Sequence, residues 1–499
     1  MQGADLCLLS SDFVRFLVYT NILFLISPVF ADMVTLGKPI HSHPLEDENA
    51  APVVSVSEDS KTLDAFLRLI YPVESPAFTT LGEVQDVLEA TLKYQGNSVI
   101  MKPVTDALHS FLPTHALSIF AIACRFDLES EARIAAIAAG LDPRRPTTNF
   151  GYVAEMDHIS AGAYFRLRWY FWRGPTHDAD RRDVYWRRFS FINRNPADCV
   201  LPRKLETYNT TKTANADAAT TVDVLTTWLG FGLFKRRPAD LILRSSDGVA
   251  FSAHGFSLSI SSPVLARQIE ELSASLTESL PVVDVPEPSP LLYLLLCSCY
   301  GIPLQLVKGG NGQAVSLSQL SKLVHVARKY GMTRTVDQAR MLFRCSLKDE
   351  PLRAYFIAVS LGWHSEAQTA ARLAVTESSI SYVYTPSMED VSAKAYYNLL
   401  QYDVDVQCAA DAVVQRYSAK RTLNSGWYPQ DSGRTLPELR TFIVHRSTDK
   451  LFHTIAQREF GYMKDGKGGD VYMPNLLAES RNMEVELQAA INQVELAFN

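Results

Sequence analysis

The chain has 499 residues, of which 47% are apolar, and its formal net charge is −6. This length supports two or three buried cores, and the acidic balance excludes a general attraction to nucleic acid or to anionic membranes. Seven cysteines with no CxxC pair indicate reduced thiols, and they argue against a disulfide framework or a zinc site. The sequence is typical of an intracellular protein, located in the cytoplasm, the nucleus or both.

The first apolar stretch, Phe16–Phe30, looks at first like the core of a signal peptide. The residues before it include Asp5 and Asp12 but only one cation, Arg15, which is the wrong charge pattern for secretion. The stretch is also too short and too polar to span a bilayer comfortably. We therefore expect a folded element here and no membrane contact.

Three blocks of the sequence occur twice, in the same order. The first pair is related by a constant offset of 235 and includes the identities Asp12/Asp247 and Pro28/Pro263. The matching blocks are Asp5–Ala31 with Asp240–Ala266, Pro52–Ser60 with Pro281–Ser289, and Met156–Leu167 with Met388–Leu399. This order indicates a tandem duplication of a unit of roughly 160 to 170 residues, the size of one domain.

The repeat holds through Leu167, and the sequence that follows it has no counterpart. The segment Phe165–Arg194 contains eight arginines, three aspartates and nine aromatic residues. Arginines interleaved with aromatic rings suit a groove for single-stranded nucleic acid. They also suit a connector that docks on a domain through its rings, and a gene-model error would produce the same departure. We favour docking or an error, because a local charge run in an acidic chain is weak support for nucleic-acid binding. The polar stretch Tyr208–Thr226 reads as a mobile linker.

The second copy has the pattern of a small α+β unit. Leu241 and Leu243 alternate as in a half-buried strand, and Asp247-Gly248 supplies a tight turn before a return strand. Ser-Pro pairs then mark helix starts, because serine accepts from an orphan amide and proline needs no donor there. These pairs are Ser262-Pro263 and Ser289-Pro290, and they flank the short alternating strand PVVDV. The predicted order is hairpin, helix, capped helix, strand and capped helix.

Three strings of the second copy carry a family resemblance: DLILRSSDGVAFSAHGFSLSISSPVL, LPVVDVPEPS and LLYLLLCSCYG. They resemble the BTB/POZ domain, specifically the BTB proteins abundant in mushroom-forming fungi. The first copy is more eroded, with Phe13 in place of the turn glycine and Tyr19 in place of the family histidine, His254. The resemblance implies two tandem units, each a short mixed sheet flanked by helices and followed by a helical extension. It also implies a structural role for His254.

The helical pattern continues after each BTB-like block. Leu317–Phe343 places apolar residues at helical spacing, with Gly331 ending its first helix. Near the end of the chain we expect a helix over Phe442–Met463, a turn over Lys464–Asp470 and an amphipathic helix over Asn475–Phe498. The predicted segments are 1–168 for the first unit, 169–237 for the Arg/aromatic segment and linker, 238–403 for the second unit, and 404–499 for a mostly helical region.

No constellation for catalysis is assembled in the sequence. Gly309–Gly312 lacks the lysine and hydroxyl of a phosphate-binding loop, and no HExxH or GxSxG is present. His41 and His43 lie in a proline-bounded loop without a third ligand, which indicates solvated side chains and not a metal site. We expect no enzyme activity, no cofactor and no metal.

With catalysis set aside, protein binding is the function class that the sequence favours. The resemblance implies pairing with other BTB units, within the chain or between chains. Two units on one chain favour an intramolecular pseudo-dimer, because tethering raises the effective concentration. BTB adaptors of cullin ubiquitin ligases often carry an apolar-x-Glu element before the next strand. The candidate partner-binding residues in that interval are Ile269, Glu271, Leu276 and Glu278. The main hypothesis is a non-enzymatic scaffold; a cullin adaptor and a nucleic-acid-associated regulator are the alternatives.

Overall fold

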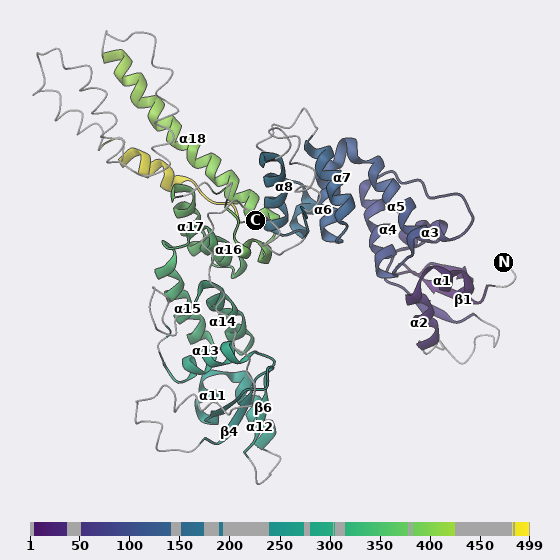
Figure 1. The fold of residues 1–499 in the computed structure, drawn as a ribbon, viewed down its shortest axis with the longest axis horizontal. Helices are drawn as coiled ribbons and strands as arrows, with labels where there is room; N and C mark the ends of the chain where they lie inside the picture. The colour runs from purple at the N-terminus through teal and green to yellow at the C-terminus, as the bar shows by residue number, and fades with distance from the viewer. Residues whose placement is uncertain are drawn as a thin grey trace, which may run out of the picture. The chain divides into compact units, whose positions relative to one another are not determined.

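The computed structural model describes residues 4–36, 51–140, 151–173, 189–192, 239–273, 280–302, 304, 315–377, 380, 383–424, 482 and 485–498. Over these residues the chain is α+β, as predicted: it is mostly helical, with two small three-stranded sheets (Figure 1). It divides into two compact units. The first comprises Met1–Ile159 and Ala163–Cys199, and the second Ser160–Gly162 and Val200–Asn499. The four segment boundaries drawn from the sequence remain predictions.

The first unit begins with a hairpin and continues into helices. Its elements are β1 (Leu6–Leu9), β2 (Arg15–Val18), α1 (Thr20–Ile26), α2 (Pro28–Leu36), β3 (Val53–Ser55), α3 (Ser60–Ile70), α4 (Leu81–Lys93), α5 (Ser98–Ser110), α6 (Leu112–Arg125), α7 (Glu129–Gly140), the 3₁₀ turn η1 (Ala154–His158) and α8 (Ala161–Arg173). Leu23 and Phe30, from the stretch that imitates a signal peptide, are buried in this unit. Among the described residues, no helix has the length and apolar character needed to cross a membrane.

The second unit repeats this order element by element. It contains β4 (Leu241–Arg244), β5 (Ala250–Ala253), α11 (Gly255–Ser261), α12 (Pro263–Ser273), β6 (Val282–Asp284), α13 (Ser289–Cys299), α14 (Leu317–Lys329), α15 (Thr333–Ser346), α16 (Pro351–Ser360), α17 (His364–Glu377), η2 (Pro386–Asp390) and α18 (Ala393–Asn424). A further helix covers residues 485–493. The predicted final helix is therefore wrong at its end, because residues 494–498 are not helical. The features expected over 442–470 lie outside the described residues.

The two sheets have the same topology. The strand orders are β2-β1-β3 and β5-β4-β6, with an antiparallel hairpin and one parallel strand in each. In the second sheet Leu243 pairs with Phe251 on one side and Val283 on the other. The parallel strand follows two helices, as a crossover connection requires.

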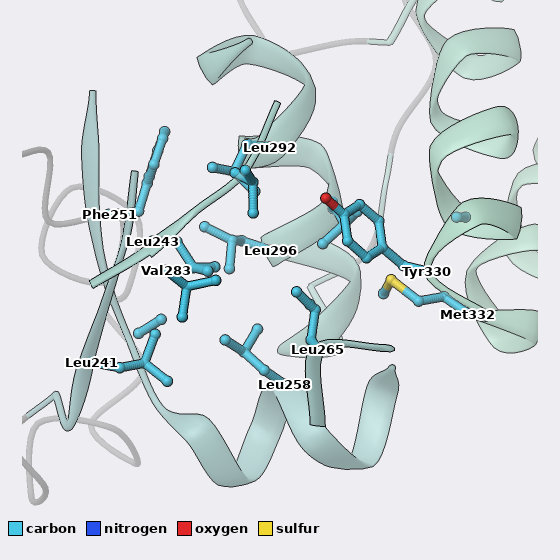
Figure 2. Packing of buried hydrophobic residues seen from close by; sticks show 14 of the residues in the cluster. Leu241, Leu243, Phe251, Leu258, Leu265, Val283, Leu292, Leu296, Tyr330 and Met332 are labelled. Carbon is cyan, nitrogen blue, oxygen red and sulfur yellow. The ribbon is translucent and has the colours of Figure 1, made fainter. Parts of the chain in front are cut away.

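Helices cover one face of the second sheet. Figure 2 shows Leu243 of β4 and Val283 of β6 directed toward Leu258, Leu296 and the other helical side chains of the core. Leu258 and Leu296 are fully buried. Because side chains alternate across a strand, Ile242 and Arg244 point to the opposite, more exposed face. This alternation is the half-buried strand pattern that the sequence indicated.

One glutamate in each unit, buried in the second and partly buried in the first, joins the hairpin, the parallel strand and the helices. The Glu287 carboxylate accepts hydrogen bonds from the Tyr330 hydroxyl at 2.5 Å and the Lys329 ammonium at 2.6 Å. Its carbonyl oxygen accepts from the Ser246 amide, and the Tyr330 carbonyl accepts from the Ser262 hydroxyl at 2.7 Å. Burial, together with the bond to Glu287, raises the pKa of Tyr330.

The first unit repeats this network with its own residues. Glu58 accepts from Tyr94 at 2.5 Å and Lys93 at 2.7 Å, and the Ser27 hydroxyl donates to the Tyr94 carbonyl. Burial opposes ionisation of Glu58, but the bonds from Lys93 and Tyr94 outweigh it and lower its pKa. The duplication therefore extends to individual hydrogen bonds.

The turn aspartate of each hairpin also caps a distant helix. Asp247 accepts from the Ser245 hydroxyl within the turn, and from the Ser289 amide and hydroxyl at 2.9 and 2.6 Å. Ser289 begins α13, so one carboxylate fixes both the turn and the helix start. These bonds, that from Ser245 first, lower the pKa of Asp247. Asp12 does the same for α3 through Ser60.

Three residues of the first unit have left-handed backbone conformations that the second unit assigns to glycine. They are Phe13 (φ 65°), Gln95 (φ 50°) and Asp127 (φ 56°). The equivalent residues of the second unit are Gly248, Gly331 and Gly362, with φ of 81°, 68° and 70°. A side chain in this region costs of order 1 kcal/mol or more, whereas glycine adopts it freely. The first unit therefore keeps the turn geometry at the expense of backbone strain.

We predict that Phe13→Gly stabilises the first unit by about 1 kcal/mol, because it relieves strain at a side chain that packs on little. The Phe13 side chain is 82% exposed, so its removal costs little packing. Chemical denaturation with unit-resolved hydrogen exchange would measure the change.

The matched control is Gly248→Ala in the second unit. No heavy atom lies within 4 Å of the position of its added Cβ, so only the φ of 81° opposes the substitution. We expect a loss of about 1 kcal/mol in the second unit alone. Equal stability of Phe13→Gly and wild type would refute the strain assigned to the first unit.

Glu366 is a second buried carboxylate of the second unit, with a side chain 1% exposed. It accepts from Arg340 Nε at 2.7 Å and Arg344 Nε at 2.8 Å. The Arg340 bond is the main cause that lowers its pKa from 4.5 to about 2, against the opposing effect of burial. In the first unit Glu131 and His109 form the equivalent pair.

We predict that the free energy of unfolding of the second unit falls as pH drops from 4.5 toward 2. The folded-state pKa is depressed, so the stabilisation is complete above the unfolded pKa and disappears below the folded one. Glu366→Gln should cost about 2–3 kcal/mol at pH 7 and should flatten this acid dependence. Urea denaturation at several pH values measures it. The exposed Glu271→Gln serves as the control, and an unchanged pH slope in Glu366→Gln would contradict the assignment.

Candidate functional site

The candidate partner-binding residues fall on and after α12. Ile269 is partly buried and packs against the core of the second unit, whereas Glu271 is exposed. Leu276 and Glu278 lie outside the described residues. Ile269 is thus tied to the fold, and Glu271 is the residue of this pair that a partner can reach.

A different apolar surface stands out on α1 and α11, the helices that follow the two hairpins. Phe256 and Ile260 of α11 are 75% and 71% exposed, although Leu258 between them is fully buried. On α1, Leu25 is 80% exposed and occupies the position equivalent to Ile260. We call Leu25, Phe256 and Ile260 the exposed helix faces.

Each of these short helices is held at both ends by hydrogen bonds, so its outer face is fixed. At the start of α11, the Gly255 amide donates to Asp240 at 2.6 Å and the His254 amide donates to the Tyr300 hydroxyl at 3.0 Å. At its end, the Ser262 amide donates to the Leu258 carbonyl at 2.8 Å. The position of His254, which is 8% exposed, agrees with a structural role.

The start of α1 is held in the same way. The Thr20 amide donates to Asp5 at 2.8 Å, and the Tyr19 amide donates to the Tyr71 hydroxyl at 2.8 Å. The bonds from Thr20, its hydroxyl first, lower the pKa of Asp5. The sequence signal for these faces was the spacing of Phe256 and Ile260 opposite Leu258, which places them on the outer side of a helix. Local pattern alone did not show that this side is uncovered.

The described part of the Arg/aromatic segment is docked on the first unit. Phe189 and Phe191 are 2% and 0% exposed, and the Phe191 ring packs edge-on against Phe120 at 5.4 Å between centroids. Arg166 of α8, 2% exposed, donates from Nε to the Phe191 carbonyl at 2.7 Å. Rings buried in this way cannot stack on bases. The docking interpretation accounts for these residues; 174–188 and 193–194 lie outside the described residues.

Residues 189–192 are held by α7 as well. The Glu129 carboxylate accepts from the amides of Phe191 and Ile192 at 3.1–3.3 Å and from the Ser190 hydroxyl at 2.8 Å. Arg133, one turn further along α7, donates to the Phe189 carbonyl. Charged side chains of α7 thus form hydrogen bonds with the main chain of this short segment.

We predict that Phe191→Ala destabilises the first unit by about 3–5 kcal/mol, because it empties a fully buried aromatic site. Thermal unfolding measures the loss. Arg168→Ala on α8, at a partly buried position, serves as a milder comparison. A normal melting temperature for Phe191→Ala would show that the segment does not dock in solution.

Two cysteines of the described residues are poorly suited to act as nucleophiles. Burial raises the pKa of the Cys299 thiol to about 11, and that of Cys124 further, so both are protonated at neutral pH. Among the residues that the structure describes, no group of three or more His, Cys, Asp or Glu side chains could hold a metal ion. His41 and His43 lie outside that part of the chain.

The chain matches no protein-family model, and no curated protein matches it significantly.

Proposed function

We propose that this chain is a non-enzymatic interaction or scaffold protein that acts through two BTB/POZ-like units. Its partners would be other BTB units, within the chain or on another chain. The resemblance of the sequence to BTB proteins and the α+β character of both units support this proposal. The proposal assigns no residue of the chain to a catalytic site.

The observation that carries the proposal is the exposure of Leu25 and Ile260 at equivalent positions of the two units. Both are more than two thirds exposed on rigidly held helices, and Phe256 adds a third apolar side chain. Burying such a side chain in a contact contributes about 1.5–3 kcal/mol. Phe256 and Ile260 lie one turn apart on α11, and neighbouring exposed apolar groups of this kind mark candidate interaction sites.

The test is a double substitution, Phe256→Asp with Ile260→Asp, in the full-length chain. We expect association with BTB-type partners to weaken at least about tenfold, because each aspartate would have to be desolvated in the contact. Light scattering over a concentration series measures self-association, and affinity purification with mass spectrometry identifies other partners. Leu25→Asp tests the first unit in the same way.

The control is Met341→Asp on α15, which is 68% exposed and lies outside the exposed helix faces. It should leave association unchanged. If the double variant and the control behave alike, the exposed helix faces are not the contact and the proposal loses its main support.

The second candidate is a substrate adaptor of a cullin ubiquitin ligase, favoured by the exposure of Glu271 on α12. Because Ile269 packs on the core, Ile269→Ala would disturb folding as well as binding. Glu271→Arg is the cleaner test. Loss of a co-purifying cullin in this variant would favour the adaptor, and absence of a cullin from the wild-type preparation would count against it.

A further inference from the structure

In the second unit, helices α17 and α18 hold an extended segment, Val494–Phe498. The Gln368 side chain of α17 donates to the Val494 carbonyl at 3.3 Å and accepts from the Leu496 amide at 3.0 Å. Asn398 of α18 donates to the Ala497 carbonyl at 2.9 Å. Main-chain bonds of this kind bind an extended peptide irrespective of most of its side chains.

Alternate side chains of this segment meet the unit. Leu496 is 5% exposed, and the Phe498 ring lies 4.6 Å from the His364 ring of α17, between centroids. Ala497 between them and Glu495 before them are exposed. The unit therefore contacts an apolar side chain of the segment and an aromatic side chain two positions later.

The first unit holds residues 189–192 at the same place. The segment lies on Glu129 and Arg133 of α7, which are equivalent to His364 and Gln368 of α17. The register between α7 and α17 is fixed by matching buried residues: Ala132/Ala367, Ala135/Ala370, Ala136/Ala371 and Ala139/Ala374. Arg166 of α8 is equivalent to Asn398 of α18 by the register of the third repeated block. Each pair of helices thus contacts one non-helical segment through the same three positions. Glu129, Arg133 and Arg166 all bond to main-chain groups in the first unit. In the second unit Gln368 and Asn398 bond to the main chain, whereas the His364 ring contacts the Phe498 ring.

The two sites differ in how firmly they hold their segments. In the first unit the bonds come from charged groups, and Phe189 and Phe191 are 2% and 0% exposed. In the second unit the three bonds come from neutral amides, and Val494 and Phe498 are only partly buried. Charge-assisted hydrogen bonds are about twice as strong as neutral ones. The second segment is therefore the more easily displaced.

We propose that the surface formed by Gln368, His364 and Asn398 is a peptide-binding site for an extended partner segment of the pattern Leu-x-aromatic. Val494–Phe498 is its resident ligand in cis and competes with the partner segment. The equivalent site of the first unit is filled by residues 189–192. This inference does not depend on pairing between BTB units.

The probe is a fluorescent peptide with the sequence of residues 485–498, added to the full-length chain. Leu496→Asp weakens the resident segment, so this variant should bind the peptide at least about tenfold more tightly than wild type, which carries its own competitor. Adding Gln368→Ala to Leu496→Asp should weaken binding again by about tenfold, because two main-chain bonds are lost. Fluorescence anisotropy measures the affinity of the peptide for the wild type, the single variant and the double variant.

Glu495→Ala is the matched control on the chain, since this exposed residue lies beside Leu496 and should leave peptide affinity at the wild-type value. A peptide carrying Leu496→Asp is the control on the probe and should not bind. Equal affinity of wild type and Leu496→Asp for the normal peptide would overturn the proposal.

A second measurement covers the case in which Leu496→Asp does not fold. Hydrogen exchange of the wild-type chain in excess peptide should accelerate over residues 494–498 and stay unchanged over 189–192. No acceleration at millimolar peptide would overturn the proposal. If the wild-type chain is a dimer and the peptide dissociates it, the site binds residues 494–498 of a second copy. That result would overturn the assignment of Val494–Phe498 as the ligand in cis.

Discussion

A buried carboxylate holds each unit together. Glu287 bonds through its carbonyl oxygen to the hairpin and through its side chain to the C-terminal end of α14. The carbonyl of Tyr330 then receives the hydroxyl of Ser262, where α12 begins. The sheet and its helices are therefore joined by one continuous series of bonds around the apolar core. A buried network of this type stabilises only when each member is satisfied, which explains why the first unit retains Glu58, Tyr94 and Ser27 in the same relation.

This hydrogen-bonded frame leaves two kinds of surface on which the proposed interactions rest. One is formed by the exposed helix faces, where the bonds at both helix ends fix apolar side chains that the core does not use. The other lies on the helical extension, where side-chain amides of α17 and α18 bond to the backbone of an extended segment. The first surface suits a folded partner and the second suits a linear one. In the proposed scaffold role, these two surfaces would take partners of different physical type.

The sequence predicted much of the frame because its signals are local. The Asp247-Gly248 turn, the Ser262-Pro263 helix start and the alternation of Leu241 with Leu243 each depend on a few neighbouring residues. The docking of Val494–Phe498 could not be predicted, because Gln368 lies more than a hundred residues away and helical spacing continues through Leu496. Nor could it be known that Ile269 packs inward, since an apolar-x-Glu pattern does not state which side of a helix the core covers. Periodicity specifies elements, whereas the contacts that make sites come from tertiary structure.

The left-handed residues Phe13, Gln95 and Asp127 bear on how such a duplication is detected. Glycine is the residue by which a sequence profile marks a sharp turn, so each of these positions scores as a mismatch although the backbone makes the same turn. The hydrogen bonds of Asp12 and Glu58 hold the chain around Phe13 whether or not glycine is present. The same backbone turn is therefore made with and without glycine, so two copies of a domain can share their architecture although their sequences differ at the turns.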